Sequence, residues 1–217
     1  MVCTAGEAIF DCTHSTLDQF VSTMHPYATD LDKRGYVPLS IAFASIVAAW
    51  SLSTFVLALK LIIPWWVDAP SVLGFYGLFF VAFDKRLWRL RPIRGLLGMP
   101  NLNGTYRGYI RSSRDRHRSR HAATLKIRQT WTEISMVMTT RTSSGQSVNA
   151  SIITETGTIT YEYLNEPKPG TVATMHMHRG TGMLNLVSEG RLEGEYYSGR
   201  DRQTYGLLLF ARVEKKT

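Results

Sequence analysis

The segment Val37–Leu59 reads VPLSIAFASIVAAWSLSTFVLAL, a run of 23 residues without Asp, Glu, Lys, Arg or His. As a helix it is ~34 Å long at ~1.5 Å per residue, which is enough to cross a hydrocarbon core of ~30 Å. A buried helix of a soluble protein rarely stays apolar on all sides over this length. The segment therefore predicts a transmembrane helix, and the rest of the chain is interpreted around a membrane anchor.

A second apolar run, Ala69–Phe83, follows closely and has only 15 residues. This is short for a span, but the flanking cations Lys85, Arg86 and Arg89 can snorkel to the membrane surface. The connection contains the pair Trp65-Trp66, and tryptophan rings prefer the membrane–water interface. We therefore expect residues 36–94 to form a two-helix transmembrane hairpin that ends in a basic juxtamembrane step.

Basic residues gather on one side of this hairpin. Lys60 alone lies in its loop, whereas the two ends carry Lys33, Arg34, Lys85, Arg86, Arg89, Arg91 and Arg94. Because the cytoplasmic flanks of membrane helices carry the excess of Lys and Arg, we expect a multi-pass protein with both termini in the cytoplasm.

Residues 1–35 are a polar lead-in to which the sequence assigns no function. Residues 1–36 hold five acids and two bases, and no basic region precedes a short apolar run, so we expect no signal peptide. Cys3 and Cys12 lie here. Two cysteines make neither a zinc pattern nor a disulfide scaffold, and we expect both to be reduced.

Beyond Gly95 the hydrophobic period changes from helical to two. The alternating segments are Asn103–Ile110, Ala123–Trp131, Ile134–Met138, Ile159–Tyr163, Met175–Met177, Leu192–Tyr196 and Leu207–Phe210. Clusters typical of turns separate them at Ser143–Gly145, Asn165–Gly170, Arg179–Gly182 and Ser198–Asp201. About eight short strands without an intervening helix indicate an antiparallel barrel or sandwich over residues 95–217. We expect an eight-stranded β-barrel, because a closed barrel leaves no open edge, and this size can hold one small ligand.

Charge indicates the kinds of partner. The formal net charge is +8, and residues 95–217 hold 17 bases against ten acids. A basic domain beside a membrane suggests anionic lipid, nucleic acid or a phosphorylated small ligand. The most basic stretch, Arg111–His121, is interpreted first as a solvated hairpin loop, then as a contact with the anionic inner leaflet, and last as a nucleic-acid site.

The sequence contains no motif of an enzyme. It lacks a glycine-rich phosphate loop, a nucleophile elbow and the spacing of a metal site. His176 and His178 share one face of a strand, but no third ligand is evident. We therefore expect no catalysis, no cofactor and no metal.

Polar side chains among inward-facing apolar ones favour a ligand-binding barrel. Gln129 alternates with Leu125 and Ile127, and an inward polar group needs a partner or a polar ligand. Arg200 and Arg202 flank Asp201 in a tight loop at a predicted barrel mouth, where guanidinium groups can bind phosphates while aromatic rings stack on bases. Core packing accounts equally for the aromatic residues, and loop solvation for the arginines. The candidate ligand-binding residues are Tyr106, Gln129, Trp131, Tyr163, Asn165, His178, Tyr196, Arg200, Arg202 and Thr204.

The order of these features resembles one family. A membrane hairpin, a basic step and the strand opening Pro100–Gly108, PNLNGTYRG, are followed by IRQTW at 127–131, YEYLNEP at 161–167 and GEYYSGR at 194–200. This arrangement is similar to the CD-NTase-associated protein 15 type of CBASS antiphage effector over residues 37–217. Family members often have Trp after Gly-Thr, where this chain has Tyr106.

The resemblance implies a function. It implies that a paired cyclic-nucleotide synthase makes a cyclic di- or oligonucleotide and that the barrel binds it. We then expect the protein to form a homo-oligomer whose helices disrupt the lipid bilayer of the bacterial inner membrane in an abortive infection. No DNA or RNA target is implied. Two alternatives stay open: a membrane-anchored, lipocalin-like barrel that carries an apolar ligand, and a structural membrane protein whose barrel binds only partners. The bases, linkage and ring size of the nucleotide are left open.

Overall fold

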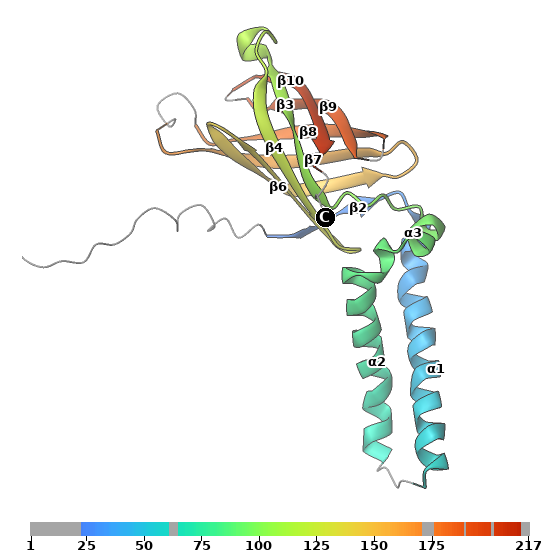
Figure 1. Cartoon of the computed structure of the whole chain (residues 1–217). Coiled ribbons are helices and arrows are strands. Elements are labelled where there is room, and N and C mark those ends of the chain that lie inside the picture. Colours follow the sequence, from blue (N-terminus) through green and yellow to red (C-terminus); the bar gives the residue numbers. More distant parts are fainter. Residues whose placement is uncertain (1–22, 61–64, 171–175, 189, 201, 214–217) are drawn as a thin grey trace, which may run out of the picture.

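The computed structural model describes residues 23–60, 65–170, 176–188, 190–200 and 202–213. A pair of long helices carries a β-barrel at one end (Figure 1). Cys3, Cys12 and Met175, the first residue of one predicted strand, lie outside the described residues.

The helical part consists of α1 (Tyr36–Ala58) and α2 (Trp65–Lys85), which lie side by side. Buried residues of α1 recur every four positions, at Val37, Ile41, Ser45 and Ala49, and two of these are small enough for close helix packing. Large apolar side chains such as Phe43 and Trp50 are exposed, which suits lipid better than water. Within the described residues, α1 is the one helix that is long and apolar enough to cross a membrane by these criteria.

A short juxtamembrane segment connects α2 to the barrel. It contains η2 (Leu87–Arg89) and α3 (Arg91–Leu97), and α3 ends at Gly98, whose φ of 78° is a left-handed conformation that glycine adopts readily. Trp88 is fully buried, and its ring lies 6.3 Å from that of Trp131, which also meets Phe83 edge-on at 5.4 Å. These three rings pack the end of α2 against the barrel.

The barrel has eight antiparallel strands. They are β3 (Gly104–Ser112), β4 (His121–Gln129), β5 (Glu133–Thr140), β6 (Ser143–Ile153), β7 (Thr158–Pro167), β8 (His178–Ser188), β9 (Arg191–Ser198) and β10 (Tyr205–Arg212). Their order is β5-β4-β3-β10-β9-β8-β7-β6, and a β5–β6 pairing closes the ring. Alternate inward side chains such as Leu125, Leu184 and Leu208 form the core. The predicted eight-stranded antiparallel barrel is confirmed.

Two predicted turns are wrong. Ser143–Gly145 begins β6, and Arg179–Gly182 belongs to β8. The glycines of β8 serve packing rather than turning, because a Cβ on Gly182 would lie 2.4 Å from the Tyr161 ring. Most of β6, which runs to Ile153, was not predicted, because its inward positions are mainly small or polar.

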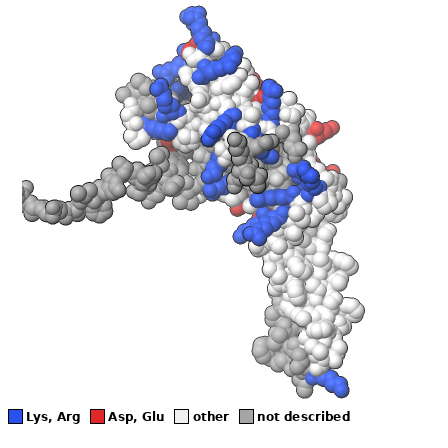
Figure 2. All heavy atoms as spheres, in the orientation of Figure 1, with Lys and Arg blue, Asp and Glu red and all other residues white. Residues whose placement is uncertain are grey.

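The basic stretch Arg111–His121 lies far from the membrane helices. It spans the end of β3, η3 (Ser113–Asp115) and the start of β4, at the barrel end opposite α1 and α2 (Figure 1). The interpretation of this stretch as a contact with the leaflet that holds the anchor is therefore wrong. Lys and Arg are also visible at the junction between barrel and helices, and far fewer along the helices (Figure 2).

The end of the polar lead-in joins the sheet. β1 (His25–Pro26) pairs with β5, and β2 (Ala28–Thr29) pairs with β6. η1 (Asp32–Gly35) then leads into α1. The sequence did not predict these two short strands.

Candidate functional site

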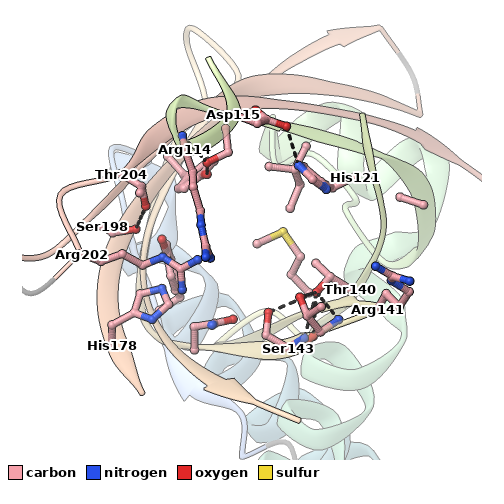
Figure 3. A pocket seen from close by; sticks show the side chains of 18 of the residues that line it. Arg114, Asp115, His121, Thr140, Arg141, Ser143, His178, Ser198, Arg202 and Thr204 are labelled. Atoms are coloured by element: carbon pink, nitrogen blue, oxygen red, sulfur yellow. Dashed lines mark hydrogen bonds and ion pairs between the residues drawn. The ribbon is translucent and has the colours of Figure 1, made fainter. Parts of the chain in front are cut away.

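A cavity of about 700 Å³ opens at the barrel end farthest from the helices (Figure 3). This volume lies in the range of ~300–1,000 Å³ that is usual for small-molecule sites. The lining comes from the β3–β4 hairpin, the β5–β6 hairpin and the nearby ends of β7 to β10. The members used below are Ser112, Arg114, Asp115, Arg120, His121, Met138, Thr140, Thr142, Ser143, Tyr163, Asn165, His178, Tyr196, Ser198, Arg202 and Thr204.

Tyrosine rings form the aromatic wall of the cavity. Tyr163 lies across Gly180 of the neighbouring strand, where an added Cβ would be 2.4 Å from its hydroxyl, and Tyr196 lies similarly close to Gly206. Burial raises the pKa of Tyr163, so the phenol is neutral at physiological pH. His178 meets the Tyr163 ring edge-on at 6.5 Å between centroids. The cross-strand glycines thus fix flat rings beside the opening.

Two arginines face each other in the cavity. Arg114 comes from η3 and Arg202 from the β9–β10 turn, and their guanidinium groups lie close together (Figure 3). Burial lowers the pKa of Arg202, and the charge of Arg114 lowers it further. Within the described part of the chain neither arginine forms a salt bridge with a carboxylate. Two neighbouring cations without such a partner favour the binding of an anion between them.

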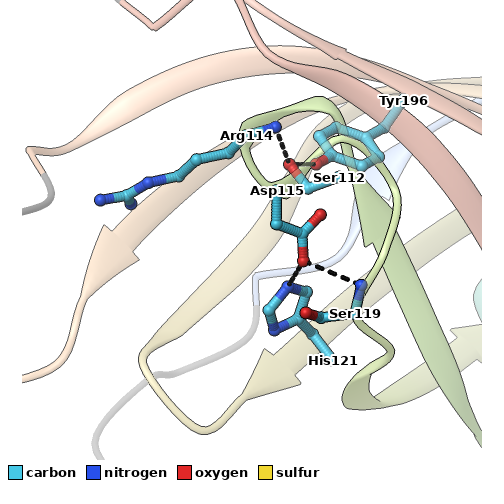
Figure 4. A network of polar contacts seen from close by, with 6 residues as sticks. All are labelled: Ser112, Arg114, Asp115, Ser119, His121 and Tyr196. Atoms are coloured by element: carbon cyan, nitrogen blue, oxygen red, sulfur yellow. Dashed lines mark hydrogen bonds and ion pairs between the residues drawn. The ribbon is translucent and has the colours of Figure 1, made fainter.

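A polar network holds the β3–β4 hairpin over the opening (Figure 4). Asp115 Oδ2 lies 2.9 Å from His121 Nε2 and accepts a hydrogen bond from the Ser119 nitrogen at 3.2 Å. Burial raises the pKa of Asp115, but the hydrogen bonds from Ser119 and His121 outweigh it and the net direction is down. Tyr196 donates from its hydroxyl to Ser112 Oγ at 2.9 Å. The network sets the position from which Arg114 reaches the cavity.

Neutral polar groups line the part of the cavity formed by the β5–β6 hairpin. The Ser143 nitrogen donates to Thr140 Oγ1 at 3.0 Å, and the two hydroxyl oxygens are 3.1 Å apart. Asn165 lies on the adjoining strand, opposite Gly145. The cavity therefore combines cations, aromatic rings and uncharged hydrogen-bonding groups. Among the described residues, no group of three His, Cys, Asp or Glu side chains comes together to hold a metal.

Comparison with known proteins agrees with this architecture. Residues 97–212 match the family described as Cap15, cyclic dinucleotide receptor domain. Residues 36–89 match Cap15, TM helices. The chain belongs to the Cap15 family. A curated relative, CD-NTase-associated protein 15 from Yersinia aleksiciae, is 33% identical over 149 residues, which cover 65% of this chain and 69% of the relative.

The Cap15 barrel brings six of the ten predicted site residues to the cavity. These are Tyr163, Asn165, His178, Tyr196, Arg202 and Thr204. Thr204 Oγ1 lies 2.8 Å from Ser198 Oγ, which closes the β9–β10 turn. Arg200 is in the same turn but is exposed and does not line the cavity.

The other three predicted residues lie at the end of the barrel nearest the helices. Gln129 Oε1 accepts a hydrogen bond from the Leu102 nitrogen at 2.9 Å, and Tyr106 donates from its hydroxyl to the Leu102 carbonyl at 2.9 Å. Trp131 packs against Phe83 and Trp88. These side chains hold the juxtamembrane segment to the barrel, away from the cavity.

Sequence reasoning did not select the residues that the β3–β4 hairpin supplies. Arg114, Asp115, Arg120 and His121 line the cavity, and all belong to the basic stretch that was interpreted as a solvated loop. The available signal was the density of arginine between two predicted strands. A single sequence does not show whether such a loop projects into solvent or folds over the barrel opening.

Proposed function

We propose that this Cap15 protein is a CBASS antiphage effector whose barrel binds a cyclic di- or oligonucleotide at its membrane-distal mouth. The observation that carries the proposal is the pair of guanidinium groups of Arg114 and Arg202 in a cavity that Tyr163 and Tyr196 also line. This arrangement lies inside the domain that matches a cyclic dinucleotide receptor.

The chemistry of a cyclic nucleotide fits each part of the cavity. Its phosphodiesters are anions, and arginine donates two parallel hydrogen bonds to such groups. Its bases present flat faces that stack on Tyr163, Tyr196 or His178, and base–aromatic stacking contributes ~1–3 kcal/mol per base. Thr140, Ser143 and Asn165 supply uncharged groups for the base edges.

The membrane part supports an effector role for this binding. Residues 36–89 match the family's membrane helices, and among the described residues α1 is long and apolar enough to span a membrane. We infer a multi-pass protein of the bacterial inner membrane with both termini in the cytoplasm, where a cyclic-nucleotide synthase works. Binding favours a homo-oligomer whose helices disrupt the bilayer, because a ligand that binds the associated state better shifts the population toward it. The protein performs no catalysis in this scheme.

The experiment is a binding and leakage assay on the full chain. The detergent-solubilised protein is screened by thermal shift against cyclic dinucleotides, cyclic trinucleotides and linear dinucleotide controls. A ligand at ~100 times its dissociation constant adds ~2.7 kcal/mol of stability, which is a shift of several degrees. The same ligand should then release dye from vesicles that contain the protein.

Other outcomes would overturn the proposal. A shift with fatty acids and none with nucleotides would favour a lipocalin-like carrier. No shift with any small molecule would favour a structural protein that binds only partners. A shift with nucleotides but no dye release would remove the membrane-disrupting step and leave the receptor.

A further inference from the structure

The barrel is incompletely closed between β5 and β6. Only three residue pairs join these neighbours: Val137 with Gln146, Met138 with Gly145, and Thr139 with Ser144. By contrast, β6 is paired with β7 from Ser143 to Ile153. The β6–β7 register shifts between Ser147 and Asn149, and such bulges bend a strand away from its partner. In β5 before Val137 and in β6 after Ser147, therefore, the two strands have edges that do not pair with each other. We call this gap the seam.

The chain fills the seam with residues 23–35, which we call the arm. His25 and Pro26 pair antiparallel with Ile134 and Glu133 of β5, and Ala28 and Thr29 pair parallel with Ser151 and Ile152 of β6. The arm meets β6 where the strands separate, since His25 Nε2 lies 2.8 Å from Ser147 Oγ. The same Ser147 oxygen accepts a hydrogen bond from the Met136 nitrogen at 2.9 Å.

Side chains of the arm hold it at both edges. Tyr27 is buried and donates from its hydroxyl to the Trp131 carbonyl at 3.0 Å. Asp30 Oδ1 accepts hydrogen bonds from the nitrogen and the hydroxyl of Thr154, each at 2.8 Å. Arg34 donates to the carbonyl oxygens of Tyr27 and Trp131 at 2.8 and 3.0 Å. The arm thus adds two short strands to the sheet of its own chain. It then continues into the membrane helix α1, which begins at Tyr36.

The seam adjoins the part of the β5–β6 hairpin that lines the candidate ligand cavity. The three residue pairs that join β5 to β6 include Met138, which lines the cavity, and the hairpin continues into Thr140, Thr142 and Ser143 at its rim. A ligand that contacts this hairpin therefore acts on the strands that hold the arm. The arm also precedes both segments that match the Cap15 family, residues 36–89 and 97–212.

We propose that the seam is the docking surface for a second copy of this chain, which inserts its own arm in place of the resident one. A neighbouring copy carries the same residues, so the exchanged contacts are chemically identical and only the connectivity changes, as in domain swapping. The strand edges that the resident arm leaves free when it detaches are ready sites for strand addition. Confinement to one membrane raises the local concentration of the second copy.

The exchange places α1 of one copy beside the barrel of the next, because the arm ends with η1 and continues directly into α1 at Tyr36. This inference rests on the proposed function, in which nucleotide binding drives association. It adds the surface by which the copies meet and the segment that occupies it.

A crosslinking experiment tests the exchange directly. Cys3 and Cys12 are replaced by Ser, and two versions of the full chain are then made, one with Pro26→Cys and one with Glu133→Cys. Residues 26 and 133 are direct partners across antiparallel strands, and the Cα separation of such partners, ~4.5–5.5 Å, suits a disulfide. Because each chain has one cysteine, a disulfide between the two versions requires the arm of one copy in the seam of another.

The expected result is a severalfold rise in the mixed disulfide when both versions share a vesicle and a cyclic dinucleotide is added. The matched control pairs Pro26→Cys with Val187→Cys, an exposed position on β8 away from the seam, and should show no rise. Equal crosslinking to Val187→Cys, or no mixed disulfide despite ligand-driven association, would overturn the exchange.

A second arrangement separates this inference from the proposed function. Asp30→Ala with Arg34→Ala loosens the arm, and the mixed disulfide should then form without ligand. If no nucleotide binds and the loosened protein still crosslinks, the proposed function fails and the exchange stands.

A single chain with both Pro26→Cys and Glu133→Cys should bind nucleotide when oxidised but associate only after reduction. Association of the oxidised chain to the same extent would overturn the exchange.

Discussion

Asp84, at the end of α2, accepts two hydrogen bonds from Thr132 in the β4–β5 turn, at 2.9 Å from its nitrogen and 2.7 Å from its hydroxyl. The Trp131 nitrogen also donates to the Asp84 carbonyl, at 3.1 Å. From η1, the short helix that leads directly into α1, Arg34 donates to the carbonyl oxygens of Trp131 and Thr132 at 3.0 and 3.3 Å. One turn of the barrel is therefore attached to both membrane helices.

Replacing Asp84 by Ala should weaken the attachment without reaching the cavity. The variant loses two hydrogen bonds to a charged group, and hydrogen bonds of this kind contribute ~1.5–3 kcal/mol each. Nucleotide affinity, measured by calorimetry, should be unchanged, whereas nucleotide-dependent dye release from vesicles should fall. Thr132→Val, which keeps the backbone donor and removes the hydroxyl, should give a smaller loss. A parallel fall in affinity and dye release would show that Asp84 acts on binding instead.

The packing of Tyr161 predicts two opposite changes in stability. Its hydroxyl is buried and has no hydrogen-bond partner among the described residues, and burial raises its pKa. Tyr161→Phe should raise the melting temperature, because an unsatisfied buried polar group costs ~1–3 kcal/mol. Gly182→Ala should lower it by a similar amount, because the new methyl group would meet the fully enclosed ring at 2.4 Å.

The matched control for the glycine change is Gly95→Ala on α3, where an added Cβ meets nothing within 4 Å. It should be neutral or slightly stabilising, since alanine favours a helix by ~0.5–1 kcal/mol over glycine. Thermal unfolding of all three variants in one detergent measures the comparison. Equal melting temperatures for Gly182→Ala and the parent protein would contradict the close packing.

The sequence predicted those strands of the barrel in which apolar and polar residues alternate clearly. It did not predict strands whose inward residues are small or polar. Strands such as β4 alternate large apolar residues with polar ones, and the period alone identifies them. In β6 the inward positions include Ser143, Gly145 and Ser147, so the alternation is invisible by hydrophobicity. Glycines of β8 likewise suggested a turn, because the tyrosines that need the space come from another strand.

The candidate site divides in the same way. Tyr163, Asn165 and Tyr196 follow from alternation within single strands, and the structure places all three at the cavity. An inward polar residue such as Gln129 was expected to face a ligand, but its partner is the Leu102 nitrogen of the chain itself. Which end of the barrel a residue occupies depends on strand register, and one sequence does not give the register.

The orientation in the membrane can be tested with reporters. Fusion of a fluorescent protein after Thr217 should be bright, and alkaline phosphatase at the same position should be inactive, because the flanking cations favour the cytoplasm. Phosphatase inserted after Lys60, between α1 and α2, should be active in the periplasm. Activity of the enzyme after Thr217 would contradict the inferred topology.

Asp30 should make attachment of the arm dependent on pH. Hydrogen bonds from Thr154, first from its nitrogen, hold the pKa of this carboxyl below its usual value of ~3.9. A lowered pKa in the folded state stabilises the protein above the unfolded pKa, and this contribution is lost as pH falls through the folded pKa. The parent should melt at a higher temperature than Asp30→Asn, and this difference should be largest near pH 6 and shrink toward pH 3. A difference that stays constant would show that the charge of Asp30 has no such role.

Arg202 and Arg200 provide a matched pair within one turn. Arg202 lines the cavity beside Arg114, whereas Arg200 is exposed outside it. Losing a hydrogen bond to a charged group costs ~1.5–3 kcal/mol, so Arg202→Ala and Arg114→Ala should each weaken nucleotide binding about 10- to 100-fold by calorimetry. Arg200→Ala should leave affinity within about twofold, and its affinity should depend on salt as in the parent, because a distant exposed charge is screened. Equal losses for Arg200→Ala and Arg202→Ala would indicate a general effect of positive charge, and the paired guanidinium groups would then no longer identify the phosphate site.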